Sequence, residues 1–168
     1  MNAPPKQLHL LRHAKSSWDD PALADHDRPL APRGRRAARR LGAHLHEHQV
    51  EPELVLCSSA LRAQETLALL ELAGSVSVEP ELYGASSAGL LERLRRVPEA
   101  VASLMLIGHN PDMHGLATML AAEGPLRIEM MTKFPTGALA TLAPSGTWQE
   151  LRWGTCELTA FVRPRDLD

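Results

Sequence analysis

The apolar positions of the chain fall into short runs that predict six β-strands. Leu104–Ile107 is apolar at every position, which is typical of a strand that is buried on both faces of a sheet. The other runs are similarly short, as expected for strands. They are Leu8–Leu11, Leu54–Cys57, Val76–Glu79, Ala138–Leu142 and Leu158–Val162.

Between these runs, apolar residues recur every three or four positions and predict helices. The segment Arg33–His48 carries Ala38, Leu41 and Leu45 at that spacing, with Pro32 near its start, where proline is tolerated. Three further helices have capping candidates before them. The first has apolar residues at Ala60, Ala63, Leu67 and Leu70, and Ser58 or Ser59 can cap it. The second has Leu90, Leu94 and Val97 after the serine pair Ser86–Ser87. The third has Met113, Leu116, Ala117 and Leu120, with Asn110 as cap and Pro111 as first residue.

The alternation of strands and helices predicts the fold class. Strands that alternate with helices favour an α/β fold, a three-layer sandwich with a mainly parallel central sheet and helices on both faces. A chain of 168 residues can bury a hydrophobic core of its own, so we expect one domain over residues 1–168. In such sheets, ligands bind beyond the carboxyl ends of the strands.

Basic side chains follow three of the predicted strands. Arg12 and His13 come directly after Leu8–Leu11, and Arg62 lies in the first turn of the helix after the second strand. His109 follows Leu104–Ile107 after a single glycine. Because parallel strands end at the same edge of a sheet, we expect these four side chains to converge.

Composition and charge narrow the classes of partner. The chain is 44% hydrophobic and 23% charged, with a net charge of −2, which argues against nucleic acid or an anionic membrane as partner. No apolar run approaches the length of a membrane span, and residues 1–7 lack the apolar core of a secretion signal. Two cysteines, Cys57 and Cys156, favour reduced thiols, so a cytoplasmic protein is expected.

The predicted cluster is suited to phosphoryl chemistry. Guanidinium groups such as those of Arg12 and Arg62 match phosphate oxygens with several fixed N–H donors. Neighbouring cations should lower the pKa of the His13 imidazole, and a neutral imidazole can attack phosphorus. The arginines can stabilise the transition state as metal ions do elsewhere, so no metal or cofactor is expected. We therefore predict that His13 takes a phosphoryl group, which water then removes.

The residues also resemble a known family. "LLRHAKS" is similar to the signature of the histidine phosphatase superfamily, which is phosphoglycerate mutase-like in fold, and the match is closer to SixA-type phosphohistidine phosphatases. The resemblance implies that His13 is the nucleophile and that Arg12, Arg62 and His109 line the phosphate pocket. It implies that Arg28 is a further pocket arginine, and that the substrate is phosphohistidine on a protein. The matching segments are Leu10–Ser16, Asp25–Gly34, Cys57–Thr66, Glu79–Ser86, Ile107–Pro111 and Phe134–Leu142.

The acid that protonates an alkoxide leaving group in many superfamily members has no counterpart in register. Where mutase-like members carry a glutamate, this chain reads Leu82–Gly84, and where acid-phosphatase-like members carry an aspartate it has Asn110; Glu81 and Asp112 are only nearby. Imidazole is a better leaving group than an alkoxide and needs less acid help. The sequence therefore favours an N–P substrate, and it leaves the proton donor open between Glu81, Asp112, His109 and water.

Several side chains have alternative interpretations. Arg28 could brace its loop through Asp25 or Asp27, and His26 and Trp18 could shape the pocket mouth. His44 and His48 have a metal-ligand spacing but no further ligands, so we expect no metal there. The basic helix face Arg35–Arg40 could dock an acidic partner, or it could simply be solvated.

The residues after the second predicted strand also allow an alternative mechanism, that of the cysteine phosphatases, with Cys57 as the nucleophile. Such enzymes need five residues between cysteine and arginine, whereas four separate Cys57 from Arg62. Cys57 is therefore interpreted as a buried strand residue.

The sequence is compatible with three functions. The first is a phosphatase for protein phosphohistidine. The second is a phosphatase for small phosphate esters or phosphoramidates. The third is a non-catalytic phosphate- or phosphoprotein-binding module, which would need the arginines but not a nucleophile.

Overall fold

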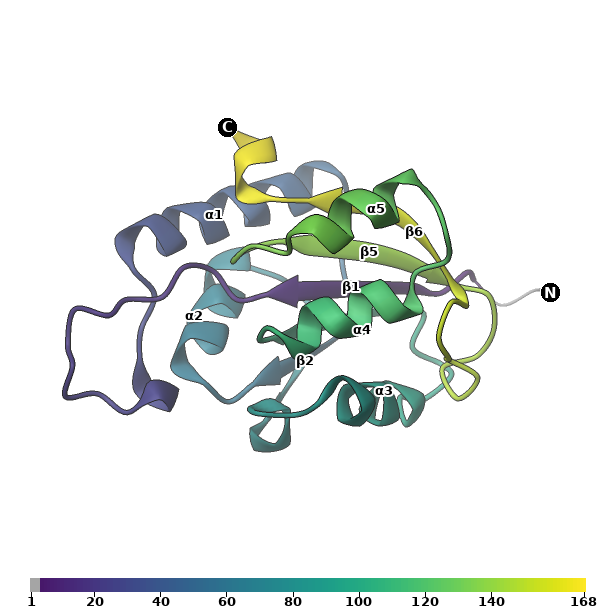
Figure 1. Ribbon diagram of the computed structural model, residues 1–168, viewed down its shortest axis with the longest axis horizontal. Helices are drawn as coiled ribbons and strands as arrows, with labels where there is room; N and C mark the ends of the chain where they lie inside the picture. The colour runs from purple at the N-terminus through teal and green to yellow at the C-terminus, as the bar shows by residue number, and fades with distance from the viewer. Residues whose placement is uncertain (1–3) are drawn as a thin grey trace.

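Six strands form one mixed sheet in the computed structural model, which describes residues 4–168 (Figure 1). In chain order the strands are β1 (Gln7–Arg12), β2 (Leu54–Ser58), β3 (Ser75–Glu79), β4 (Ser103–Gly108), β5 (Leu139–Pro144) and β6 (Cys156–Val162). Their order across the sheet is β3-β2-β4-β1-β5-β6. The first four are parallel, and β5 and β6 are antiparallel to their neighbours. The predicted α/β class and the mainly parallel sheet are confirmed.

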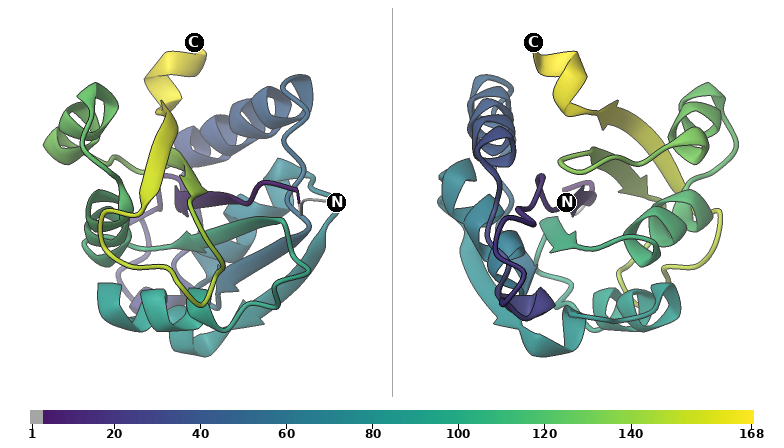
Figure 2. Two further views of the ribbon diagram at one scale, coloured as in Figure 1. Left: turned by 90° about the vertical axis from the view of Figure 1, so that its right-hand side faces the viewer. Right: turned by 60° about the vertical axis from the view of Figure 1, so that its left-hand side comes forward.

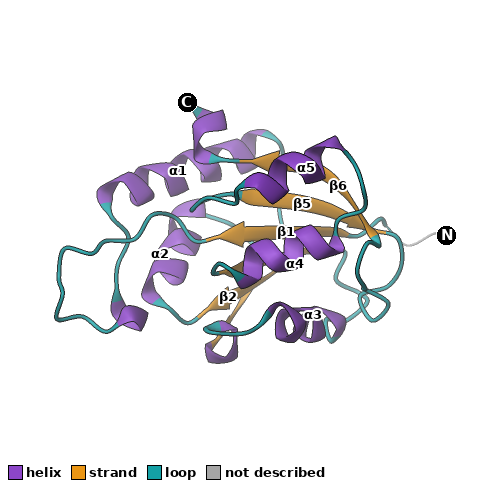
Figure 3. Ribbon diagram, viewed as in Figure 1, coloured by secondary structure: helices purple, strands orange, loops and turns teal. Residues whose placement is uncertain are grey.

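Within residues 4–168, five α-helices cover the two faces of the sheet (Figures 1 and 2). They are α1 (Pro32–Glu47), α2 (Leu61–Leu70), α3 (Ser87–Arg95), α4 (Asp112–Leu120) and α5 (Pro125–Thr132). Three short 3-10 helices lie at Asp25–Asp27, Pro80–Leu82 and Pro164–Leu167. Helices α1 and α2 lie on one face, and α3, α4 and α5 lie on the other, which gives the three predicted layers (Figure 3).

The alternation of side chains along the strands explains these layers. Leu104 and Leu106 of β4 pack in the cluster that includes residues of α3, α4 and α5, whereas Met105 and Ile107 pack with residues of α1 and α2. Successive side chains of a strand point to opposite faces, so a continuous apolar run is buried on both sides. The uninterrupted hydrophobicity of β4 is therefore a consequence of its central place in the sheet.

Three local predictions about helices need correction. Ala60, and neither serine, occupies the N-cap of α2, while the Ser58 hydroxyl accepts a hydrogen bond from the Ala60 amide. Helix α4 begins at Asp112 rather than at Pro111. Helix α5 was not predicted; only Met130 of its residues is buried, so it lacks the apolar stripe that reveals a helix in the sequence. The cap of α3 at Ser86 is confirmed, because its hydroxyl accepts the amide of Gly89.

The first residues of the chain were expected to lack a secretion signal. That prediction concerns residues 1–7, of which residues 1–3 lie outside the described residues. Among residues 4–168, no helix is both long and apolar enough to cross a membrane.

Candidate active site

The register of two central strands brings two histidines together. Strands β1 and β4 pair in parallel with Arg12 opposite Gly108, so His13 and His109 are the next residue of each strand. The backbone N–H of His13 donates to the carbonyl oxygen of Gly108 at 3.1 Å. The two imidazole rings lie with their centroids 5.1 Å apart. The convergence expected from the strand ends therefore exists for these side chains.

The surroundings of His13 determine which of its nitrogens carries the proton. Nδ1 lies 2.7 Å from the carbonyl oxygen of Ala14, which can only accept, so Nδ1 donates and Nε2 keeps a free electron pair. The pKa of His13 is lowered to about 3, mainly by burial and also by the nearby His109, Arg62 and Arg12, while the hydrogen bond to Ala14 acts in the opposite direction. His13 is thus a neutral imidazole at pH 7. The lowered pKa was predicted, but its main cause is burial rather than the neighbouring cations.

Arg62 reaches His13 from the first turn of α2. Its side chain is buried, and Nε donates to Nε2 of His13 at 3.4 Å. Thr66, one turn later, holds this helix against the segment after His13, because its hydroxyl oxygen accepts the Ala14 amide at 3.1 Å and donates to the Arg62 carbonyl at 2.7 Å. The position of Arg62 relative to His13 is therefore set by a buried contact between α2 and the end of β1.

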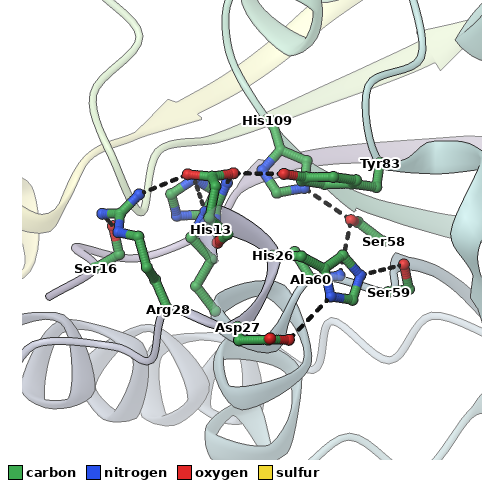
Figure 4. Close-up of polar contacts among 12 residues, drawn as sticks. His13, Ser16, His26, Asp27, Arg28, Ser58, Ser59, Ala60, Tyr83 and His109 are labelled. Carbon is green, nitrogen blue, oxygen red and sulfur yellow. Dashed lines mark hydrogen bonds and ion pairs between the residues drawn. The ribbon is translucent and has the colours of Figure 1, made fainter. Parts of the chain in front are cut away.

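His109 is held by a serine at the end of the neighbouring strand. Strand β2 pairs with β4 so that Cys57 lies opposite Ile107, and the next residue, Ser58, places its hydroxyl 2.7 Å from His109 Nε2 (Figure 4). The pKa of His109 is lowered to about 4, mainly by burial and also by the nearby Arg62. Among residues 4–168, the buried Nδ1 of His109 has no hydrogen-bond partner. This nitrogen is free to contact a bound group.

Arg12 is anchored from the other side by the segment before β5. Its Nη1 donates to the carbonyl oxygen of Phe134 at 3.1 Å, while its buried Nε has no partner among the described residues. The amide of Gly137 donates to the carbonyl oxygens of both Arg12 and His13, each at 3.0 Å. Gly137 has a φ of +77°, a conformation that glycine adopts without strain. This turn fixes the backbone at the point where β1 ends.

The carboxylate of Asp25 bridges two arginines. The sequence did not place this carboxylate in the pocket. Arg62 donates from Nη2 to Asp25 Oδ2 at 3.0 Å and from Nη1 to the Asp25 carbonyl oxygen at 2.6 Å. Arg28 donates from Nη1 to Oδ1 at 3.0 Å, and the Tyr83 hydroxyl donates to Oδ2 at 2.6 Å (Figure 4). These hydrogen bonds from Tyr83, Arg28 and Arg62 hold the pKa of Asp25 well below its usual range. Asp25 is therefore ionised in this arrangement.

Arg28 is buried and engaged by its own loop. Besides Asp25, it donates from Nε to the Ser17 carbonyl oxygen at 3.1 Å and from Nη2 to the Ser16 hydroxyl. The exposed ring of Trp18 stacks over its guanidinium, with Cζ 3.2 Å from the ring centroid. The structure thus contains the bracing contact with Asp25 that the sequence allowed as an alternative to phosphate contact.

The two nearby acids left open by the sequence do not lie free in the cluster. Asp112 accepts hydrogen bonds from the amide and hydroxyl of Ser87, so it ties α4 to the start of α3. Glu81 is exposed in the short helix after β3. The ring of Tyr83 lies edge-on to the rings of His109 and His26, with centroid distances of 5.6 Å and 4.9 Å. His26 also contacts the Ser59 hydroxyl at 2.8 Å.

Cys57, the alternative nucleophile, is unsuited to that role. Cys57 is fully buried on the α1–α2 side of the sheet, and burial raises the pKa of its thiol to about 12. The nucleophilic thiolate is therefore disfavoured at neutral pH. Both cysteines are free rather than joined in a disulfide.

The candidate metal pair lies at the end of α1. His48 Nδ1 contacts the His44 carbonyl oxygen at 2.8 Å, which helps to cap the helix. Within residues 4–168, no group of three histidine, cysteine or acidic side chains is arranged to hold a metal ion.

Sequence reasoning did not assign Ser58, Tyr83 and Asp25 to the cluster, although all three contact its side chains. The sequence pattern assigns Ser58 to a helix cap, and it marks Tyr83 only as a position that lacks an acid. Asp25 precedes Arg28 by three residues, a spacing that suggests a local ion pair but gives no sign of Arg62. The contact with Arg62 joins residues 37 positions apart, so only the tertiary structure reveals it.

Comparison with known proteins identifies relatives along most of the chain. The sequence profile described as "Histidine phosphatase superfamily (branch 1)" matches residues 8–99. An uncharacterized protein of Mycobacterium tuberculosis is 38% identical over 159 residues, which cover 92% of this chain and all of that protein. The phosphohistidine phosphatase SixA of Escherichia coli is 34% identical over 155 residues, covering 85% of this chain and 92% of SixA.

Solved structures agree with this result. A structure of the protein histidine phosphatase SixA in complex with tungstate has a TM-score of 0.74 and 29% identity, covering 96% of this chain and 99% of that chain. A proposed SixA phosphohistidine phosphatase from Nakamurella multipartitia has a TM-score of 0.87 and 31% identity, covering 96% and 98% of the two chains.

Proposed function

Because the chain belongs to the histidine phosphatase superfamily as a SixA-type member, and is therefore a phosphatase, we propose that it hydrolyses phosphohistidine on proteins through a covalent intermediate on His13. The observation that carries the proposal is the state of the His13 imidazole. Its Nδ1 is bound to the Ala14 carbonyl oxygen, and Nε2 is unprotonated beside Arg62. A neutral imidazole with a free electron pair, next to fixed cations, is an activated nucleophile for phosphorus.

The proposed reaction has two displacements. In the first, the Nε2 electron pair of His13 forms a bond to phosphorus, and the N–P bond of the substrate breaks. In the second, water attacks the phosphorus, the bond to Nε2 breaks and orthophosphate leaves. The leaving imidazole takes a proton from solvent in the first step, and the attacking water returns a proton to solvent in the second while its hydroxyl goes to the phosphate, so that one water molecule is consumed overall. Arg12, Arg62 and the free Nδ1 of His109 are proposed to bind the phosphoryl oxygens, with Arg28 at the edge of the pocket.

The ionised state of Asp25 supports an N–P substrate. Among the described residues, Asp25 is the carboxylate bonded to the pocket arginines, and its contacts with Tyr83, Arg28 and Arg62 keep it ionised. Asp112 is committed to Ser87. An ionised carboxylate cannot protonate an alkoxide, whereas imidazole leaves with less help. The similarity to SixA of Escherichia coli, a phosphohistidine phosphatase, supports the same substrate class.

The test is a trapping experiment in the presence of chelator. The protein is mixed with a protein that carries radiolabelled phosphohistidine and, separately, with small phosphate esters. We expect release of phosphate from phosphohistidine and a transient label on the enzyme that is stable to base and labile to acid. The His13→Ala variant should lose the label and at least about a thousandfold in kcat/KM. His44→Ala, which removes a histidine at the far end of α1, should retain both.

Several results would contradict the proposal. Turnover by His13→Ala would reject the mechanism. Hydrolysis of esters without hydrolysis of phosphohistidine would instead support the small-substrate alternative.

A further inference from the structure

A basic groove lies beside the candidate active site, on the same edge of the sheet. It has a volume of about 640 Å³ and is bounded by α1, by the end of α5 with residues 132–136, and by the C-terminal segment after β6. Lys15, two residues after His13, lies at the groove. Its wall at Pro135 and Thr136 continues into Gly137, whose amide binds the backbone of Arg12 and His13. The groove and the active site therefore share the same backbone turn.

The charge of this groove is opposite to that of the chain. Two carboxylates, Glu129 and Asp168, line it together with six cationic side chains, a side-chain charge of +4 in a chain whose net charge is −2. The six cations are Lys15, Arg33, Arg40, Lys133, Arg163 and Arg165. Such a concentration of one sign in a concave surface attracts the opposite charge and speeds encounter.

Four of the cations are available to a ligand. Arg163 is paired with Glu129 at 2.6 Å, and Arg40 with Asp168 at 3.2 Å. Within residues 4–168, the side chains of Lys15, Arg33, Lys133 and Arg165 make no ion pair or hydrogen bond, and all four are exposed. They come from four different segments, so the free positive charge is spread around the groove. Separate positive charges fit a chain with several carboxylates better than a single phosphate group.

We propose that this groove docks an acidic segment of the protein that carries the phosphohistidine. The inference rests on the proposed function. The apolar parts of the wall, at Ala37, Pro135 and Pro164, allow the segment's side-chain stems to pack while its carboxylates meet the four free cations. The location differs from the one that the sequence suggested, the helix face Arg35–Arg40. Of that face, Arg40 and Ala37 line the groove, and Arg36 and Arg39 do not.

Two synthetic peptides test this docking. Each carries one histidine phosphorylated with phosphoramidate, flanked on both sides by four glutamates in one peptide and by four glutamines in the other. At low ionic strength, we expect kcat/KM to be about tenfold higher for the glutamate peptide, mainly through KM, because several weak exposed pairs act together. At 0.3 M salt the preference should disappear, because screening shortens the range of the attraction.

Two double variants that remove the same charge separate local docking from the overall electrostatic field of the protein. Arg33→Gln with Lys133→Gln removes two free groove cations and should reduce the preference to about twofold or less, with the glutamine peptide hydrolysed as before. Arg36→Gln with Arg39→Gln removes the same charge from exposed positions outside the groove and should keep the preference.

The outcomes distinguish the docking from the catalytic proposal. Equal rates for both peptides with the unaltered protein, or equal losses in both double variants, would overturn the docking groove while leaving phosphohistidine hydrolysis intact. Failure to hydrolyse either peptide would overturn the proposed function and the docking inference with it.

Discussion

Asp25 and Arg62 form a double contact inside the proposed phosphate-binding cluster. The carboxylate of Asp25 lies 3.0 Å from Nη2 of Arg62, and its backbone carbonyl oxygen lies 2.6 Å from Nη1. An arginine proposed to hold phosphoryl oxygens thus already holds a protein anion. A guanidinium has five N–H donors, so Arg62 can bind a phosphoryl group only with its remaining donors or by exchanging some of these contacts.

Replacing Asp25 with asparagine should strengthen the binding of phosphate-like anions. The substitution removes a negative charge that competes for Arg62 and Arg28 but keeps a side chain of similar shape. We expect the inhibition constant of vanadate to fall about three- to tenfold. Asp27→Asn is the matched control, because Asp27 is exposed and, among residues 4–168, its carboxylate contacts only the His26 side chain. Weaker vanadate binding by Asp25→Asn would show that Asp25 chiefly orients the arginines.

The stability of the protein should depend on pH through its buried histidines. Burial lowers the pKa of His13 to about 3 and the pKa values of His9 and His109 to about 4. Between these values and the ordinary pKa of about 6.5, the unfolded chain binds more protons than the folded one. The contribution of these three histidines to the free energy of unfolding should therefore be fully present above pH 6.5 and should be lost as the pH drops toward 4. The limiting slope is about 1.4 kcal/mol per pH unit for each histidine.

Urea unfolding at pH 7, 6 and 5 measures this effect. The His13→Asn variant should show a shallower fall, because one of the three histidines no longer contributes. A free energy of unfolding that stays constant between pH 7 and pH 5 would contradict the neutral state assigned to His13.

Cys57→Ser should leave the chemistry nearly unchanged. The thiol is buried among apolar side chains of the α1–α2 layer, and among the described residues its hydrogen bond goes to the Ser58 carbonyl oxygen rather than to a proposed catalytic side chain. We expect kcat/KM within about twofold of the unaltered protein and a loss of about 1 kcal/mol in the free energy of unfolding, because a hydroxyl is costlier to bury than a thiol. Cys156→Ser, on the opposite layer, provides the control. Near-total loss of activity in Cys57→Ser alone would point to a thiol nucleophile.

Gly137→Ala should affect both stability and catalysis. Gly137 has a φ of +77°, and a Cβ there would also approach Pro164 Cγ to 3.0 Å. We expect a loss of about 1–2 kcal/mol in stability, and lower kcat/KM because the Gly137 amide positions the backbone of Arg12 and His13.

Gly154→Ala separates the two effects. Gly154 has the same φ of +77°, and no atom lies within 4 Å of the Cβ position. Its backbone strain should match that of Gly137→Ala, while its kcat/KM should stay unchanged. Equal kinetics in the two variants would remove Gly137 from the positioning of the active site.

The sequence alone determined the layers of the fold and the main members of the cluster. Apolar runs and helical spacing are local properties, and parallel strands end at one edge, so the order of residues along the chain is enough to group Arg12, His13, Arg62 and His109. The tautomer of His13 also depends on its immediate neighbour, the Ala14 carbonyl oxygen, but the direction of that carbonyl is a property of the folded backbone.

Only the tertiary structure decided what surrounds these residues. The contacts of Asp25 with Arg62 and Tyr83, and of Ser58 with His109, join residues 37 to 58 positions apart in the chain. The basic groove is assembled from four segments that no sequence spacing connects. Burial, which sets the pKa of His13, likewise depends on how helices and loops pack over the strand end. Local patterns encode which element a residue joins, whereas contact partners and burial arise only when distant elements pack together.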